Sequence, residues 1–168
     1  GGTAFSMPWR KKAPAVVYAM YGGSENGTAI TDVLFGDVNP SGKMPFTIAE
    51  NLEDYPPHHL GIYNPLNKED VVYEEDIFIG YRWMDKYNTE VAYPFGYGLS
   101  YTSFHLGEPR ISASSIRSVQ EVVAADVQSV SKKGRMLKVR VPVTNTGDSF
   151  GAEIVQLYLR DVESSILR

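Results

Sequence analysis

Residues 22–45 read GGSENGTAITDVLFGDVNPSGKMP, and this stretch decides the fold of the chain. The apolar run before it, AVVYAM at residues 15–20, is short and bounded by proline and glycine, which predicts a buried strand. Two glycines then give a tight turn, Ser24 is the expected N-cap, and Glu25 falls in the first turn of a helix that ends at Gly36. Strand, glycine turn, helix, turn and next strand predict part of an α/β sheet with helices packed on it.

The expected helix has one apolar face, formed by Ala29, Ile30, Val33 and Leu34. After it, DVNPSGK at residues 37–43 has the composition of a turn, since Asn-Pro and Ser-Gly both favour bends.

Three motifs follow one another in this stretch: an aromatic residue, a Gly-Gly-x-Glu turn and Ala-x-x-Asp-Val-Leu-Phe-Gly-Asp-x-Asn-Pro-Ser-Gly-Lys-x-Pro. They stand at Tyr21, residues 22–25 and residues 29–45. In this order they resemble the end of the second domain, an α/β sandwich, in the β-glucosidases of glycoside hydrolase family 3. The length and order of the match make it specific, which Asn-Pro-Ser-Gly by itself would not be.

The composition excludes several classes of function. The chain has 168 residues, 43% of them hydrophobic, a net charge of −4 and no cysteine. No basic stripe is present, which argues against a nucleic acid partner. Without cysteine there is no disulfide or thiolate chemistry, and the redox compartment stays undecided. No apolar run reaches the roughly 18 residues needed to span a bilayer, so no membrane partner is expected.

The first residues, GGTAFSMPWRKK, have no initiator methionine and no continuous apolar core, so they do not read as a signal peptide. A sequence that starts inside a motif indicates a fragment of a longer protein. The resemblance favours a secreted parent enzyme and leaves a cytoplasmic one open.

Residues 3–9 (TAFSMPW) resemble the family motif Gly-x-Pro-Val-x-x-Pro-Trp, with Ala4 in place of the usual proline. Trp9 has two interpretations, a platform for a sugar ring or a core residue under the sheet. We expect the core position, because large aromatic residues beside strand ends usually pack.

The pattern is less regular after residue 45. We expect a short strand at residues 46–48, a turn at 50–54 and extended backbone through Tyr-Pro-Pro at 55–57. His58 and His59 are adjacent and have no third ligand at metal spacing, so we interpret them as surface histidines.

Residues 67–76 (NKEDVVYEED) bring five carboxylates close together in the sequence. Glycosidases work with two carboxyl groups that face each other across the scissile bond, but sequence neighbours do not face each other in this way. We expect solvated loop charge and one structural ion pair, between Glu75 or Asp76 and Arg82.

Two further segments, VYEEDIFIGYRW at residues 72–83 and VAYPFGYGLSYTSF at residues 91–104, also resemble the family, and in the second only Tyr93 replaces a phenylalanine. In the family this region links the α/β sandwich to a terminal fibronectin type III-like β-sandwich. We expect its aromatic rings to pack between domains and not to stack on sugar; they are Tyr93, Phe95, Tyr97 and Tyr101.

The last part of the chain contains two alternating segments, LKVRVPV at residues 137–143 and EIVQLYL at residues 153–159. They predict half-buried strands joined by a turn at residues 144–149. Residues 108–131 are rich in Ser, Ala and Val, have no regular period and receive no function.

The predicted fold class is therefore α/β plus all-β. The expected domains are the tail of an α/β sandwich at residues 1–62, an interdomain linker at 63–103 and the start of an incomplete fibronectin type III-like β-sandwich at 104–168.

The resemblance implies a parent enzyme that hydrolyses β-linked glucosides with retention. In the family the nucleophile is an Asp in an N-terminal barrel, and the acid/base is a Glu upstream of the Pro-Trp motif. Neither segment stands in this sequence, so no catalytic residue is assigned, and no cofactor or metal is expected. Glu25, in a turn after a predicted sheet strand, is the candidate for a supporting substrate-binding role. The alternative for Glu25 is charge compensation at the helix N-terminus.

Two functions of different class remain. The first is a part of a β-glucosidase acting on cellobiose and aryl glucosides, or of a related β-xylosidase. The second is a non-catalytic carbohydrate-binding or interaction module. The oligomeric state is left open.

Overall fold

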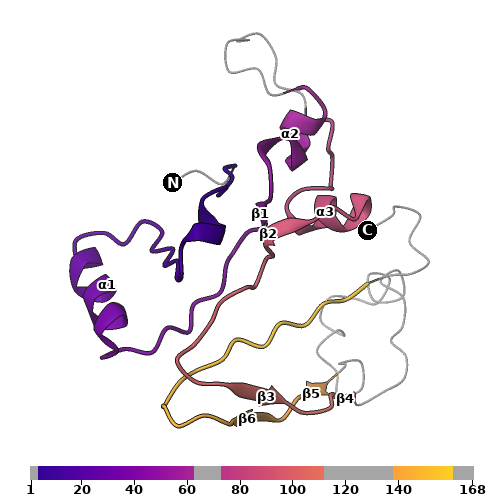
Figure 1. Ribbon diagram of the computed structural model, residues 1–168. Coiled ribbons are helices and arrows are strands. Elements are labelled where there is room, and N and C mark those ends of the chain that lie inside the picture. The colour runs from indigo at the N-terminus through magenta and orange to yellow at the C-terminus, as the bar shows by residue number, and fades with distance from the viewer. Residues whose placement is uncertain (1–3, 63–72, 112–137, 161–168) are drawn as a thin grey trace. The chain divides into compact units, whose positions relative to one another are not determined.

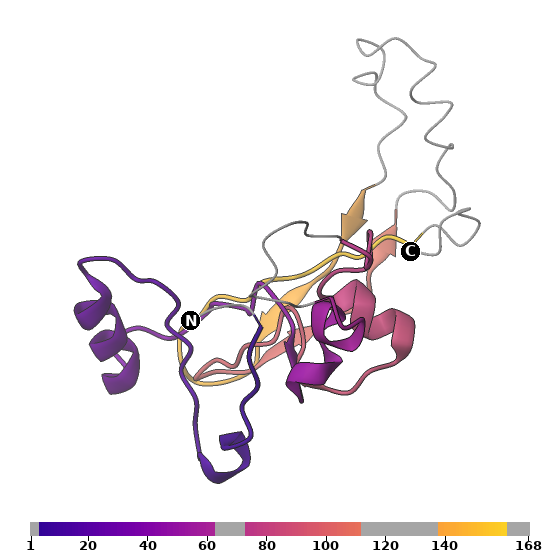
Figure 2. The same cartoon turned by 90° about the horizontal axis from the view of Figure 1, so that it is seen from above.

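The computed structural model describes residues 4–62, 73–111 and 138–160, which form two compact units. The first unit consists of Gly1–Tyr101 with Gly151–Arg168, and the second of Thr102–Phe150. Figure 1 shows the helices and strands along the chain, and Figure 2 shows them from above.

The first unit carries short helices and one strand pair. Its elements are the 3-10 turns η1 (Arg10–Lys12) and η2 (Leu52–Asp54), the helices α1 (Asn26–Phe35), α2 (Pro56–His59) and α3 (Tyr81–Tyr87), and the strands β1 (Ile48–Ala49) and β2 (Val91–Tyr93). Strands β1 and β2 pair antiparallel, Ile48 opposite Tyr93, with a register shift before Ala49.

The second unit consists of two strand pairs. Its strands are β3 (Phe104–Leu106), β4 (Arg110–Ile111), β5 (Val139–Arg140) and β6 (Val143–Asn145). Strand β3 pairs antiparallel with β6, and β4 pairs antiparallel with β5.

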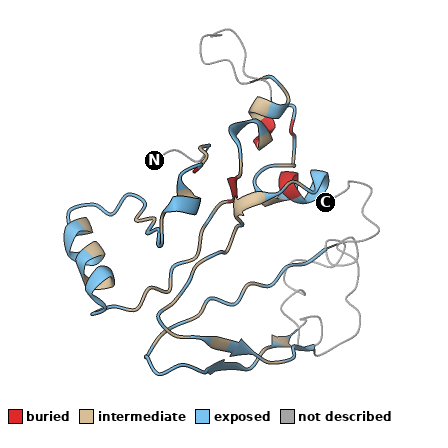
Figure 3. Cartoon of the chain, viewed as in Figure 1, coloured by how far each residue is buried: buried red, intermediate tan, exposed pale blue. Residues whose placement is uncertain are grey.

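A small core holds β1, α2 and α3 together. Ala49, Tyr55, Trp83 and Met84 are buried in one cluster, and Trp83 is only 2% exposed. Hydrogen bonds fix the polar atoms of the cluster: the Tyr55 hydroxyl accepts from Ala49 N at 3.1 Å, and Trp83 Nε1 donates to the Asp54 carbonyl at 3.1 Å. Figures 1 and 2 both show α2 and α3 side by side, and several of the buried stretches in Figure 3 lie on α2, α3 and β1.

Helix α2 differs from the expected extended backbone at residues 55–57. Tyr55 is extended, but Pro56 stands at the first helical position, where its fixed φ and missing N–H favour a helix start. Tyr55, which precedes Pro56, follows the preference of such residues for extended backbone, whereas Pro56 is helical although it also precedes a proline.

Helix α1 begins one residue later than predicted. Glu25 is its N-cap, and the Glu25 carbonyl accepts from Ala29 N at 3.0 Å, so Ser24 lies outside the helix. The predicted end is confirmed, because Gly36 adopts the left-handed conformation (φ 85°) that only glycine reaches without strain.

The apolar face of α1 is not packed on a sheet, which contradicts the prediction. No residue of the helix is buried, and Leu34 is 60% exposed. The periodic pattern was sufficient to predict the helix, but burial of its face requires a partner surface, and no described segment supplies one.

The two expected strands at residues 15–20 and 153–159 are also wrong. Neither segment forms a strand, and Val17 and Leu157 are mostly exposed. Strand assignment requires a backbone partner, and within the described residues neither segment has a paired neighbour.

Other boundaries moved by a few residues. The strand expected at residues 46–48 is β1, and the strand expected at 137–143 is divided into β5 and β6 by Pro142, which cannot donate a ladder hydrogen bond. The turn expected at 144–149 starts only after β6, and β6 is exposed instead of half-buried.

At the coarser level, the mixture of helices and strands is confirmed. The three domain boundaries stay predictions. Of the unassigned segment 108–131, residues 110–111 form β4 and residues 112–131 lie outside the described part of the chain.

Candidate functional site

Glu25 lies in an exposed turn at the start of α1. Its carboxylate accepts a hydrogen bond from Thr28 Oγ1 at 3.4 Å and makes no side-chain cap bond to the helix backbone. The prediction placed Glu25 in the first helical turn. In the structure Glu25 is the N-cap, so it lies just before that turn. Its proximity to the helix N-terminus still favours a negative charge.

The acidic segment is described from residue 73 onward, and residues 67–72 lie outside the described part. Glu74 and Asp76 are exposed, whereas Glu75 is buried with 7% of its surface exposed. The expected ion pair with Arg82 is wrong, because the ion pairs among the described residues join Arg10 and Lys11 to Glu50, and Lys43 to Glu153. Glu75 Oε2 has no hydrogen-bond partner among the described residues.

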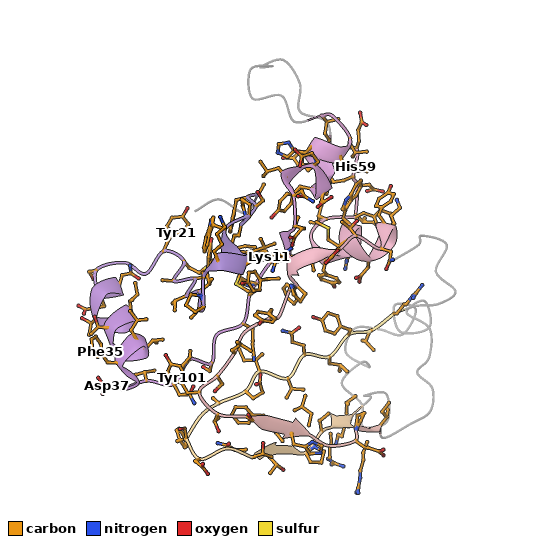
Figure 4. The ribbon with its side chains drawn as sticks, viewed as in Figure 1. Lys11, Tyr21, Phe35, Asp37, His59 and Tyr101 are labelled. Carbon is orange, nitrogen blue, oxygen red and sulfur yellow. The ribbon has the colours of Figure 1, made fainter. Side chains whose placement is uncertain are left out.

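Trp9 and the two histidines have different outcomes. Trp9 is 51% exposed at the start of η1, so its expected core position is wrong. His59 is exposed, as expected, and its ring lies 5.5 Å from that of Trp83; its position on α2 is labelled in Figure 4. His58 is half-buried, so the expected surface position is only partly met there. Within residues 4–62, 73–111 and 138–160, no group of three potential metal ligands comes together.

A connected set of contacts, which we call the clasp, joins residues 39–44, 96–101 and 153. At its centre, Lys43 Nζ lies 2.8 Å from Glu153 Oε1 and donates to the Gly98 carbonyl at 2.7 Å. Both charged side chains are largely buried, at 14% and 16% exposure. Because Lys43 binds both the Glu153 carboxylate and the Gly98 carbonyl oxygen, it holds three distant parts of the sequence together.

Backbone contacts continue the clasp on both sides of the lysine. Met44 N donates to the Tyr97 carbonyl at 2.8 Å, and Gly96 N donates to the Met44 carbonyl at 2.7 Å. Gly98 has no room for a side chain, because a Cβ there would overlap the Gly42 carbonyl oxygen. The glycines of the two sequence motifs thus allow the two backbones to approach closely.

Asn39 connects the clasp to α1. Asn39 Oδ1 accepts from Ser100 Oγ at 2.9 Å and from Tyr101 N at 2.8 Å. The Tyr101 hydroxyl donates to the Val33 carbonyl at 2.7 Å, so the ring lies by the C-terminal end of α1, near the labels of Phe35 and Asp37 in Figure 4. Tyr101 and Tyr97 are more exposed than expected, at 53% and 39%, whereas Tyr93 and Phe95 are half-buried.

The clasp gives acid-dependent stability. The hydrogen bond from Lys43 holds the pKa of Glu153 below its ordinary value, against the opposing effect of burial. A lowered carboxylate pKa contributes stability that is present above the unfolded value of about 4.3 and is lost as the pH falls through the folded value.

We therefore expect Glu153→Gln to weaken the clasp at pH 7 by about 1–2 kcal/mol. The difference from wild type should shrink as the pH falls through the lowered folded-state pKa of Glu153, because the wild-type carboxylate then becomes protonated as well. Amide hydrogen exchange at Met44 and Gly96 measures this in any longer form of the protein that folds. Glu53→Gln is the control, because Glu53 is exposed and lies outside the ion pairs described above. Equal protection in wild type and Glu153→Gln at pH 7 would contradict the role of the pair.

Two acidic side chains of the described part are largely removed from solvent, Glu75 and Glu153. The Oε2 atom of the buried Glu75 has no hydrogen-bond partner among the described residues. The Glu153 carboxylate forms an ion pair with Lys43. No described helix is long and apolar enough to cross a membrane. The contacts of the clasp hold the sequence motif at residues 39–44 against the motif at residues 96–101.

Comparison with known proteins identifies those motifs. The model of the glycosyl hydrolase family 3 C-terminal domain matches residues 1–101. The beta-glucosidase BoGH3A of Bacteroides ovatus is 44% identical over 168 residues, which are 99% of this chain and 20% of that protein. The beta-glucosidase of Kluyveromyces marxianus is 40% identical over 168 residues, 99% of this chain and 17% of that protein.

Solved structures give the same result. The Kluyveromyces marxianus beta-glucosidase in complex with glucose has a TM-score of 0.64 and 40% identity over 86% of this chain and 15% of that chain. DesR, a beta-glucosidase of Streptomyces venezuelae solved with D-glucose, has a TM-score of 0.66 and 33% identity over 86% of this chain and 16% of that chain. This chain therefore spans only 17–20% of the length of the two curated relatives.

The fold and the motifs thus place the chain in the class of glycoside hydrolases. The chain belongs to glycoside hydrolase family 3 and matches that family's C-terminal domain. The family resemblance of residues 22–45 and 91–104 is confirmed.

The clasp is the feature that sequence reasoning missed. The sequence pattern places Lys43 in a turn and Glu153 at the first position of a strand, and it does not connect the two. A signal was present, because both residues stand in segments that match the family, but no local pattern says which distant residues will pair.

Proposed function

We propose that this chain is the C-terminal part of a retaining, exo-acting β-glucosidase that removes terminal non-reducing β-D-glucosyl residues from cellobiose and aryl β-glucosides. The main support for this proposal is that 99% of the chain aligns with two proteins named beta-glucosidase, at 40–44% identity. The family model over residues 1–101 supports the same assignment.

The role we propose for this part is to support the catalytic domains, not to supply their carboxylates. It comprises the tail of an α/β sandwich, a linker and the start of a fibronectin type III-like domain. The clasp supports this role because it ties the linker motif at residues 96–101 to residues 39–44. Such a contact network holds a scaffold rigid, as precise positioning of a glycosidase site requires.

The test is the activity of the longer protein that contains this chain. We expect hydrolysis of cellobiose and of an aryl β-glucoside, with retention at the anomeric carbon detected by NMR of the first product. Preference for an aryl β-xyloside would replace glucosidase by xylosidase. A natural gene without a catalytic barrel would favour the carbohydrate-binding module.

For the parent enzyme we also propose a secreted location, based on the family resemblance. Recovery of activity from the culture medium of the source cells, with the cell lysate as the comparison, measures it. Activity confined to the lysate would favour the cytoplasmic alternative.

Glu25 is proposed as a residue at the edge of the substrate pocket, with dipole compensation as the alternative. If it only compensates the helix dipole, Glu25→Gln in the longer protein should cost at most about 1 kcal/mol of stability and leave the catalytic rate unchanged. Its exposure and its long hydrogen bond with Thr28 favour this smaller effect.

Steady-state kinetics and thermal unfolding of the same samples separate the two roles of Glu25. Thr28→Val is the matched control, since it removes the hydroxyl that donates to Glu25 and keeps the charge. A hundredfold fall in rate with an intact fold would place Glu25 in the active site.

A further inference from the structure

A hollow of about 310 Å³ opens on the first unit beside α3. It is lined by Tyr81, Asp85, Pro94, Phe95 and Tyr158. Its size is at the lower end of the range for small-molecule sites, which are mostly apolar with a few polar groups. None of these residues has a role in the proposed catalysis.

The aromatic rings of the hollow form a corner. The ring centroids of Tyr81 and Phe95 are 5.4 Å apart at an interplanar angle of 41°, and those of Tyr81 and Tyr158 are 5.8 Å apart at 85°. Tyr158 is 55% exposed, although a large aromatic ring gains by burial. Ring surface that is exposed in this chain offers a contact for the C–H face of a small ligand.

Three of the lining residues carry polar side-chain groups: Tyr81, Asp85 and Tyr158. Asp85 is exposed, and the described ion pairs do not include it. The Tyr158 hydroxyl donates to Gln156 Oε1, which leaves its oxygen as an acceptor. Apolar ring surface combined with carboxylate and hydroxyl acceptors matches a pyranose ring, which presents C–H groups on its face and hydroxyl donors around its edge.

We propose that this hollow binds one pyranose ring of a β-linked gluco-oligosaccharide, as a site additional to the catalytic one. For Phe95 this replaces the packing between domains that was expected from the sequence. The ligand class rests on the proposed β-glucosidase function, but the geometry of the hollow does not. A small organic cation is the competing ligand, because aromatic rings beside a carboxylate also attract ammonium groups.

The test uses the full-length protein that contains this chain, with its catalytic site blocked by a 2-deoxy-2-fluoro-glucoside inactivator. Calorimetric titration with the non-hydrolysable disaccharide thiocellobiose should then show a remaining site. We expect Tyr158→Ala to weaken binding by about fivefold and Asp85→Asn by about tenfold. Tyr73→Ala is the control, because Tyr73 is an exposed tyrosine that does not line the hollow.

Tyr158→Phe guards against a folding defect, since it keeps the ring and should retain most of the affinity. A diazirine-labelled cellobioside should label the segment around Tyr158 in wild type and not in Tyr158→Ala. Absence of thiocellobiose binding, equal binding by all variants, or Asp85-dependent binding of tetramethylammonium in place of the sugar would each overturn the proposal. Turnover measured on unblocked enzyme reports separately on the proposed function, so either can fail without the other.

Discussion

The 168-residue chain is expected to show no turnover of an aryl β-glucoside. Retaining cleavage requires a nucleophile and an acid/base carboxyl on opposite sides of the bond, and we assign neither to this sequence. Chromophore release, followed over days at high protein concentration, measures this directly. The longer protein under the same conditions is the positive control. Its rate of chromophore release should show the full catalytic acceleration, whereas the rate with the 168-residue chain should equal that of the uncatalysed reaction.

One result would contradict this expectation. Turnover that disappears in Glu74→Gln, Glu75→Gln or Asp76→Asn would place the chemistry in the acidic turn. Glu75 makes this outcome worth testing, because its carboxylate is buried and its Oε2 has no described hydrogen-bond partner. Glu53→Gln, a change at an exposed carboxylate outside that turn, is the matched control.

The second large effect concerns folding of the chain by itself. We expect the purified 168-residue chain to be aggregation-prone or molten, with strong ANS fluorescence and no cooperative thermal transition. Among the described residues the buried apolar side chains are few: Met7, Ile48, Ala49, Tyr55, Trp83 and Met84. Many large apolar side chains are instead exposed, including Phe35 at 81% and Leu159 at 76%.

The physical reason is that two-stranded sheets are marginal in water, and each described sheet has two strands. A small core cannot offset the conformational entropy of the ordered backbone. A single cooperative melt with dispersed amide NMR signals would contradict the expectation. The chain would then be a self-sufficient module, and carbohydrate binding would become its preferred function.

Local backbone rules predicted features that depend on one or two residues. Gly36 ends α1 because a left-handed residue must follow the helix, and glycine reaches that conformation without strain. The helix itself followed from its apolar period, and its start moved by only one residue, from Ser24 to Glu25. Family membership followed in the same way, because long motifs in a fixed order are specific by their residues alone.

Burial and pairing could not be predicted in this way. Residues 15–20 carry a strand pattern but form no strand, since a strand exists only when another backbone donates and accepts beside it. Trp9 has the composition of a core residue, yet half of its surface is exposed. These errors share one cause: sequence composition describes what a segment can bury, and not what lies against it.

The sequence by itself determined the family, the helix at residues 26–35 and its glycine end, because these depend on residues that are close together in the chain. Only the tertiary structure decided the clasp of Lys43 with Glu153, the burial of Glu75 and the aromatic hollow beside α3. Each of these brings together side chains or surroundings from distant parts of the sequence. Such contacts are selected by the total free energy of packing and hydrogen bonding, which no local pattern contains.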